Sequence, residues 1–277
     1  MSYKDIVVQI ADGRDGVVRL KVALDLAVLH DAHVTGLYVE PPLPMSAFPE
    51  IPVPVEVINA QEAAAAERLA SLAQQFNRAS SQAGISTEWR VSHADTVTAL
   101  NVNARYADLL VTGHSEGDSV SWFDMAATKH IALESGRPVL VVPCGARIAS
   151  LGQRVLVAWN GSREAVRAVH DALPLLERAS FVQVVVINPQ VGYGAHGAVP
   201  GADICLHLAR HGIQAEAYVG HTDSQAIGAA LLSQATAIGA DLVVMGAYGH
   251  SRFRELVLGG VTRHLLQHLQ VPMLMAH

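Results

Sequence analysis

The sequence predicts an α/β protein made of two tandem halves, each a doubly wound domain built on a five-stranded parallel sheet. One observation is that short apolar runs alternate with stretches of helical periodicity along the whole chain. The other is that a block of sequence occurs twice. Residues 107–113 read ADLLVTG, residues 240–246 read ADLVVMG, and further likenesses follow each block. The offset of roughly 133 residues is far longer than a solenoid unit of ~20–50 residues, so the repeat indicates a duplicated domain.

In the first half, apolar runs of four to seven residues predict strands, and the periodic segments between them predict helices. We expect strands at residues 6–10, 33–39, 87–91, 109–112 and 139–142, and helices at 17–30, 60–83, 96–106 and 126–134. The first helix follows from the spacing of Val18, Val22, Leu26 and Leu29. The proline-rich stretch 41–54 is not expected to form regular structure.

The second half repeats this order. We expect strands at residues 155–158, 181–187, 215–219, 242–245 and 273–275, and helices at 164–177, 202–211, 224–238 and 260–267. Alternation of this kind indicates a parallel sheet with right-handed crossovers and helices on both faces. The boundary lies in a short Gly-containing stretch near residues 144–152, so the predicted domains are 1–146 and 152–277.

Composition excludes several classes of protein. The chain is 51% hydrophobic with a mean hydropathy of +0.28, as expected when strands are covered on both faces. It has no uninterrupted apolar run of ~18 residues and no apolar signal region at its start, so we expect a cytoplasmic protein with no membrane partner. A net charge of −6 and a pI near 6.1 argue against a nucleic-acid partner. Cys144 and Cys205 stand apart, which favours inert thiols in a reducing compartment.

A spaced glycine pattern marks the second half. Gly246, two residues, Gly249, nine residues and then Gly259-Gly260 follow the predicted fourth strand. In such sheets, ligands bind at the carboxyl ends of strands where the strand order reverses. Glycines allow close approach to the backbone, and the N-terminus of a helix that starts at Gly260 favours an anion such as phosphate. Arg252 and Arg254, within the nine-residue segment, add cations for phosphates. The pattern favours a nucleotide polyphosphate; the alternative is that these glycines only form tight loops.

The first half lacks this pattern. After Gly113 it reads Ser115-Glu116-Gly117, and Met125-Ala126 stands where the paired glycines would be. A methionine there would crowd a phosphate, and Glu116 and Asp118 would repel one. We therefore expect one nucleotide in each chain, bound by the second half.

These residues resemble the signature of the universal stress protein family. Residues 245–249, nine residues and then 259–262 are similar to the family pattern of Gly, two residues, Gly, nine residues and Gly with Ser or Thr. Asn160-Gly161-Ser162 resembles the family's first loop, and residues 271–275 its final strand. The resemblance implies that the final strands of the two halves meet across a pseudo-two-fold axis. It also implies a fold that binds ATP in one subgroup of the family.

By this resemblance, the binding residues can be named in the second half. The phosphates and ribose would contact Gly246, Gly249, Gly259, Gly260 and Val261, and Met245 and Arg252 complete the set of candidate binding residues. Ala158 and Asn160 would lie beside the nucleoside, and Val186 would offer backbone groups to adenine. The chain departs from the family at two positions. Asn160 replaces an Asp whose charge would help to hold Mg²⁺, and Gly260 replaces a Ser or Thr hydroxyl.

The predicted function is a cytoplasmic stress-response or regulatory protein that binds ATP or a related adenine nucleotide, with or without Mg²⁺, in its C-terminal half. The alternative is a scaffold of the same fold that binds no nucleotide and acts through protein contacts or another small ligand. A second copy of the chain, in a homodimer, and other proteins are the candidate partners. We do not expect an enzyme beyond slow ATP hydrolysis, because no Walker lysine is present and Asp241 begins its strand at the end opposite the crevice.

Two further patterns are weaker. His207 and His211 are four residues apart on a predicted helix, but no His-Glu-x-x-His arrangement accompanies them, so a zinc site is disfavoured. Ser162 follows a strand, but no Gly-x-Ser-x-Gly elbow surrounds it. We expect it to be a helix cap rather than a nucleophile.

Overall fold

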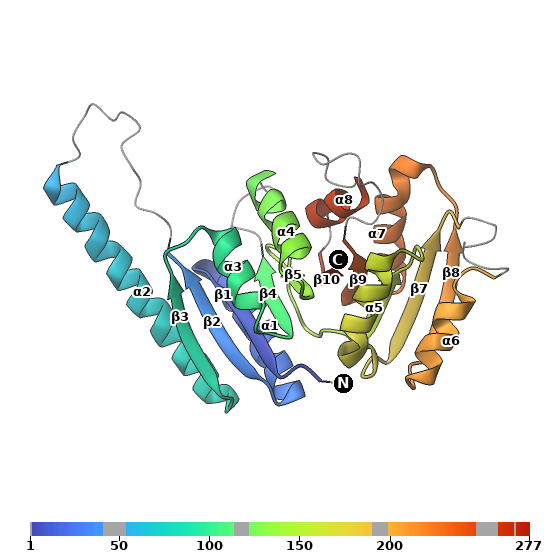
Figure 1. Ribbon diagram of the computed structural model, residues 1–277, viewed down its shortest axis with the longest axis horizontal. Coiled ribbons are helices and arrows are strands. Elements are labelled where there is room, and N and C mark those ends of the chain that lie inside the picture. The colour runs from blue at the N-terminus through green and yellow to red at the C-terminus, as the bar shows by residue number, and fades with distance from the viewer. Residues whose placement is uncertain (1, 41–53, 114–121, 190–198, 248–259, 269) are drawn as a thin grey trace.

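A computed structural model describes residues 2–40, 54–113, 122–189, 199–247, 260–268 and 270–277 (Figure 1). The strands of the first half are β1 (Asp5–Ile10), β2 (His33–Val39), β3 (Thr87–Ser92), β4 (Leu109–Gly113) and β5 (Val139–Val142). Its helices are α1 (Gly13–His30), α2 (Val55–Ala83), α3 (Thr96–Ala104) and α4 (Trp122–Glu134). The predicted elements of this half are therefore confirmed, with shifts at their ends.

The second half repeats this series. Its strands are β6 (Arg154–Ala158), β7 (Phe181–Ile187), β8 (Ala215–Gly220), β9 (Leu242–Gly246) and β10 (Met273–Ala276). Its helices are α5 (Arg163–Leu176), α6 (Ala202–Arg210), α7 (Ile227–Ala237) and α8 (Gly260–His268). The prediction of one helix over 224–238 was wrong at its start, because Ser224–Ala226 form a 3₁₀ turn before α7 begins. A tighter turn of this kind is common at helix N-termini.

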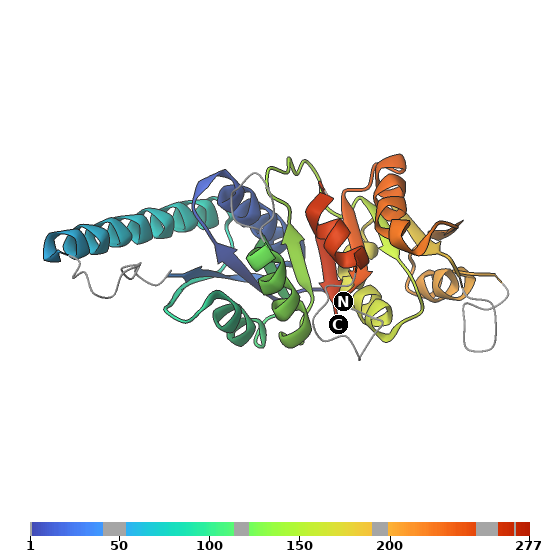
Figure 2. The ribbon, with the colours of Figure 1, turned by 90° about the horizontal axis from the view of Figure 1, so that it is seen from above.

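The ten strands form a single sheet with the order β3-β2-β1-β4-β5-β10-β9-β6-β7-β8. Strands within each half run parallel, whereas β5 and β10 pair antiparallel, with Leu140 opposite Leu274. The expected meeting of the two final strands is thus confirmed, and the two views show the halves side by side about this seam (Figures 1 and 2). A two-fold axis perpendicular to the sheet relates equivalent strands of the two halves in this antiparallel way.

Helices cover both faces of the sheet, and each face carries one apolar core that runs through both halves. One core joins α1, α2, α5 and α6 to the sheet through side chains such as Leu26, Phe76, Leu173 and Leu208. The other joins α3, α4, α7 and α8 through Leu100, Ile131, Leu231 and Leu265. Neighbouring residues of one strand enter different cores, as Val7 and Val8 do in β1. This double covering explains the apolar composition.

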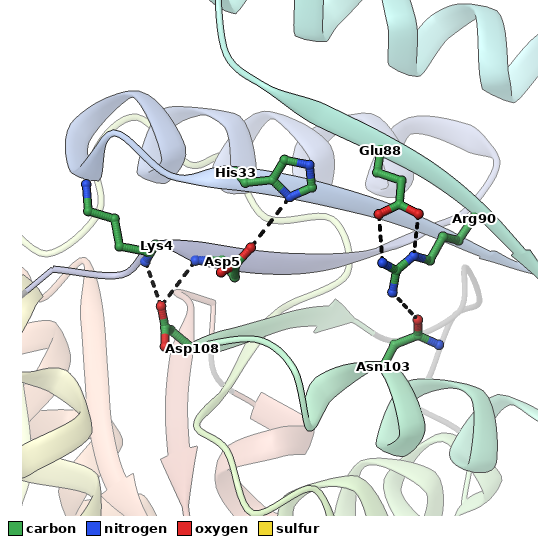
Figure 3. Close-up of polar contacts among 7 residues, drawn as sticks. All are labelled: Lys4, Asp5, His33, Glu88, Arg90, Asn103 and Asp108. Carbon is green, nitrogen blue, oxygen red and sulfur yellow. Dashed lines mark hydrogen bonds and ion pairs between the residues drawn. The ribbon is translucent and has the colours of Figure 1, made fainter.

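The aspartate of the repeated block has the same structural role in both halves. The carboxylate of Asp108 accepts hydrogen bonds from the backbone N–H groups of Lys4 at 2.6 Å and Asp5 at 3.1 Å (Figure 3). That of Asp241 accepts from the N–H groups of Gln153 at 3.1 Å and Arg154 at 2.9 Å. Each aspartate therefore ties the start of the fourth strand of its half to the start of the first. This confirms that Asp241 lies at the amino end of its strand.

Charged side chains line the outer strand β3. Arg90 donates to both carboxylate oxygens of Glu88, at 2.8 and 2.7 Å, and to the side-chain oxygen of Asn103 in α3 at 3.0 Å (Figure 3). Charges on an outer strand discourage pairing with another chain.

Across the described ranges, no helix combines the length and the apolarity that crossing a membrane needs.

Candidate functional site

The strand order of the second half reverses between β6 and β9. The chain leaves β6 through α5 on one face of the sheet, whereas it leaves β9 toward α8 on the other. Ala158, the last residue of β6, lies opposite Met245 of β9. The carboxyl ends of these two strands therefore form the position at which sheets of this type bind ligands.

Three of the predicted site residues share one layer. Met245 is 6% exposed and belongs to the core under α7 and α8. Ala158 and Val261, both half-buried, pack against the same core. The structure therefore brings together the ends of β6 and β9 and the first turn of α8, which are distant in the sequence. Because the Met245 side chain is taken up by the core, only its backbone is left for a ligand.

The loop after β6 is fixed by its own side chains. The Oδ1 of exposed Asn160 accepts from the N–H of Ser162 at 3.1 Å, and the Ser162 hydroxyl accepts from the N–H of Ala165 at 3.2 Å. Gly161 between them has a φ of +69°, which suits glycine. The prediction that Ser162 caps a helix is confirmed, since it is the N-cap of α5.

Gly246 is required by the packing of α5. A Cβ at this position would lie 2.5 Å from the backbone nitrogen of Ala165 and 2.6 Å from the carbonyl carbon of Glu164. The first turn of α5 therefore presses directly on the end of β9. The sequence analysis explained this glycine by the close approach of a ligand. In the structure, the group that lies close to it is the backbone of α5.

Gly260, in contrast, has no close neighbour among the described residues. It is exposed at the first residue of α8, and a Cβ there would meet no described atom within 4 Å. Thr262, two residues later, is 3% exposed, so its hydroxyl does not replace the one that the family pattern has at Gly260. The predicted site residues Gly249, Arg252 and Gly259 lie outside the described residues, as does Arg254.

Val186 is placed differently from the other predicted residues. It lies within β7 opposite Val219 of β8, and its fully buried side chain enters the core under α5 and α6. It therefore points to the face opposite Ala158 and Met245. The next residue, Ile187, packs on the α7–α8 side with them.

Sequence reasoning missed Asn188, which closes the end of β7. Its φ of +51° is unusual for a residue other than glycine, although asparagine tolerates it. Its side chain donates to the Thr222 carbonyl at 2.7 Å and accepts from the Thr222 N–H at 2.9 Å. The pair ties the loop after β8 to the end of β7. The Asn-Pro dipeptide directly after an apolar strand is the signal that would have marked this turn.

A buried carboxylate occupies the N-terminus of α5. Glu164 is 8% exposed and lies 3.1 Å from the guanidinium of Arg163. Burial by itself would raise the pKa of Glu164, but hydrogen bonds from its own N–H, the Ser162 hydroxyl and Arg163 bring the pKa below its usual range. The ionised carboxylate already satisfies the positive end of α5. The N-terminus of α8 is therefore the helix end that this crevice offers to an anion.

The equivalent position of the first half is filled by polar side chains. Gln9 corresponds to Ala158 and Thr112 to Met245, and the Thr112 hydroxyl donates to the Gln9 side chain at 2.5 Å. Arg19, 3% exposed, donates to the same Gln9 oxygen at 3.1 Å. A Cβ at Gly113 would lie 2.7 Å from its guanidinium. The two crevices thus differ in chemistry, although residues 115–118 and the side chain of Met125 lie outside the described part.

The described residues contain no group of three His, Cys, Asp or Glu side chains placed to hold a metal ion. His207 of α6 and His211, which caps the C-terminus of this helix, do meet, with ring centroids 4.9 Å apart, and His170 of α5 lies beside them. These rings form an aromatic contact between α5 and α6.

The sequence matches the model of the universal stress protein family over residues 2–143 and again over residues 152–277. Each match covers one of the two halves, and together they span nearly the whole chain. Among curated proteins no relative matches the sequence.

Solved structures share the fold at low sequence identity. A universal stress protein from Archaeoglobus fulgidus DSM 4304 superposes with a TM-score of 0.72 at 15% identity, covering 98% of this chain and 97% of that one. A functionally unknown protein from Pseudomonas aeruginosa PAO1 gives a TM-score of 0.63 at 15% identity, covering 99% and 92%. The cytoplasmic domain of a prokaryotic cation chloride cotransporter gives 0.55 at 12% identity, covering 98% and 94%. The paired arrangement of halves is therefore shared with other chains.

Proposed function

Because the chain belongs to the universal stress protein family as a tandem pair of domains, we propose that it is a cytoplasmic stress-response or regulatory protein that binds ATP or a related adenine nucleotide in its C-terminal half. The family sets the fold and the general role. The geometry at the carboxyl ends of β6 and β9 supports the proposed ligand and its location.

The space that the described residues leave at Gly260 is the observation that carries this proposal. The first residue of α8 is exposed, no described residue obstructs it, and the free N–H groups of a helix start bind phosphate well. Ala158 and Ile187 give the neighbouring wall apolar side chains that suit a base. In the first half, Gln9, Thr112 and Arg19 take up the corresponding region. The difference supports one nucleotide per chain.

The fit of Mg²⁺ is poorer than that of the nucleotide. Asn160 offers a neutral oxygen that is already hydrogen-bonded to Ser162, and Glu164 is engaged with Arg163. Magnesium prefers carboxylates and phosphate oxygens. We therefore expect any Mg²⁺ at this site to be held by the phosphates and water, with little help from the protein.

The experiment is a comparison of nucleotide content and affinity in matched variants. Protein purified gently and then denatured should release adenine nucleotide close to one per chain, and calorimetric titration of the stripped protein with ATP should give a single site. Gly259→Val should abolish binding, because a side chain fills space that the backbone approach requires. Met125→Val alters the corresponding position of the first half and should leave binding unchanged.

The absence of nucleotide binding in these experiments would favour the alternative function, that of a scaffold. A chain that carries no nucleotide and shows no heat with ATP would act as a scaffold through protein contacts or another ligand. Two equivalent sites would contradict the assignment to the C-terminal half.

We also propose that the nucleotide is held rather than consumed. Phosphoryl transfer needs a positioned nucleophile or base and strong stabilisation of developing charge. Asp241 is engaged at the opposite end of the sheet with the N–H groups of Gln153 and Arg154. Steady-state ATP hydrolysis should lie far below the ~1–10³ s⁻¹ that is typical of enzymes. A rate near 1 s⁻¹ that is lost in Asn160→Ala would show that the site is catalytic.

A further inference from the structure

The two halves also meet away from β5 and β10, where Tyr3, two residues before β1, contacts α5. The hydroxyl of Tyr3, which is 4% exposed, donates to the backbone carbonyl of Asp171 in α5 at 2.7 Å. The Tyr3 ring meets the ring of His30 edge-on, with centroids 5.0 Å apart and an interplanar angle of 71°. His30 is the last residue of α1. A titratable side chain of the first half therefore supports a contact with the second.

His30 is buried without a full set of hydrogen bonds. Its side chain is 4% exposed, and its Nε2 has no hydrogen-bond partner among the described residues. A neutral imidazole leaves one polar ring nitrogen without a partner, which costs less than an unpaired charge. A protonated imidazole would place an N–H donor and a positive charge there, and a buried charge without a partner costs much more.

The charges around His30 oppose a second cation. The ammonium of Lys4 donates to the His30 carbonyl at 3.2 Å and lies 3.3 Å from Asp31. The amino terminus of the chain also adds positive charge. From the second half, Arg178 adds positive charge and Glu177 adds negative charge. Burial lowers the pKa of His30 below its ordinary value of about 6.5, and repulsion from Arg178 and Lys4 lowers it further, against the weaker effect of Glu177.

We propose that His30 is an acid-sensitive latch between the two halves: protonation of its buried imidazole loosens the contact of Tyr3 with Asp171. At neutral pH the imidazole is uncharged, and the ring of Tyr3 stays packed between α1 and α5. When the pH falls, His30 is protonated more readily in the open state, in which this contact is broken, than in the closed state. The open state exposes the imidazole to water, where its charge is solvated.

Proton binding and opening of the contact are linked, so acid shifts the equilibrium toward the open state. Because the closed state has the lower histidine pKa, the open state binds more protons as the pH falls through about 6.5, and opening becomes more favourable. The equilibrium constant for opening should rise by up to ~tenfold for each pH unit, until the closed state is protonated as well. Well above pH 7 both states are neutral at His30, and the contact should be insensitive to pH.

The direct test is histidine NMR titration of the full chain. The His30 resonance, assigned through its bonds to the backbone in the isotope-labelled wild-type chain, should titrate with a midpoint below about 6.5. A midpoint at or above that value would overturn the proposal, because protonation would then not oppose closure. This measurement uses the wild-type chain, so it remains decisive even if a substitution at His30 prevents folding.

The consequence for the contact is measured by amide hydrogen exchange, corrected for the intrinsic effect of pH. Protection of residues 3–5 and 171–178 should fall between pH 7.5 and 5.5 in the wild type and stay level in His30→Phe. His221→Gln, which changes an exposed histidine, should respond as the wild type does. An unchanged acid response in His30→Phe, or an equal loss of protection throughout the chain, would refute the latch.

Discussion

At the scale of single residues, two glycines of one motif have different physical roles. Gly246 is needed because the backbone of α5 lies where a side chain would be, whereas a side chain at Gly260 would meet none of the described residues. A glycine that accommodates a helix and a glycine that admits a ligand look the same in a sequence. Only the neighbouring atoms distinguish them.

Gly246→Ala should therefore destabilise the fold whether or not nucleotide is present. The new methyl group would force α5 away from β9, and overpacking of this kind typically costs ~1–3 kcal/mol. Denaturant unfolding of the nucleotide-free chain measures the loss. Gly260→Ala is the matched control and should leave stability unchanged or slightly raised, since alanine favours helix. Equal losses in the two variants would contradict the packing role of Gly246.

Gly260→Ser should strengthen nucleotide binding. The side chain has room, and its hydroxyl would add one donor to phosphates at the start of α8, worth ~0.5–1.5 kcal/mol, or roughly a two- to tenfold gain in affinity. Calorimetric titration with ATP gives the comparison. Ala126→Ser places the same group in the first half and should have no effect. A serine at 260 that leaves the affinity unchanged would mean that phosphates do not reach this helix start.

Asn160→Asp should make ATP binding dependent on Mg²⁺. Aspartate keeps the oxygen that accepts from Ser162, so the loop should stay intact, but it adds a carboxylate that magnesium favours. We expect weaker ATP binding than in the wild type without the metal, because of charge repulsion, and stronger binding with it. Titrations with MgCl₂ and with EDTA separate the two effects. A variant as indifferent to Mg²⁺ as the wild type would place residue 160 away from the phosphates.

At the scale of elements, the repeated aspartates join pairs of strands. Asp108 holds the start of β1 to β4, and Asp241 holds the start of β6 to β9. The same geometry in both halves explains why this part of the repeat persists where the glycine motif does not. It is a requirement of the sheet rather than of the ligand.

Asp241→Ala should destabilise the chain by ~1.5–3 kcal/mol, since it removes a charged acceptor from two backbone N–H groups. Thermal and denaturant unfolding measure this loss, and Asp108→Ala should give a loss of similar size. Asp241→Asn keeps one acceptor oxygen and should recover part of the stability. If ATP affinity fell in Asp241→Asn while stability did not, the residue would have a role in the binding site that its position does not explain.

At the scale of the whole molecule, pairing of β5 with β10 makes one sheet from two domains. Four buried residues from each half form this seam, and the two cores continue across it. Separation of the halves would expose these apolar strands and their unpaired backbone groups. The two halves should therefore depend on each other for stability.

We accordingly expect the wild-type chain to unfold in a single transition. Two variants test this by tryptophan fluorescence, and both have Trp122 replaced by Phe. One keeps only Trp89 and reports on unfolding of the first half, and the other keeps only Trp159 and reports on unfolding of the second. Both should give the same midpoint in denaturant, as coincident probes do in a two-state transition. Midpoints that differ beyond error would show that each half folds as a separate unit.

The sequence by itself determined the duplicated α/β architecture, the order of the elements and the half that retains the glycine motif. Hydrophobic periodicity and turn residues are local properties, and they predicted nearly every strand and helix of the described chain within a few residues. The likeness between the two halves, together with the family resemblance, also predicted that β5 and β10 meet.

Only the tertiary structure decided which atoms fill the space around each residue. It placed α5 against Gly246, turned Val186 to the face opposite Ala158, filled the crevice of the first half with Arg19, and buried His30 beside Tyr3. These outcomes depend on contacts between segments far apart in the chain, which periodicity does not record. Whether a glycine lies against a ligand or against a neighbouring helix depends on tertiary packing, so it can be known only from the folded structure.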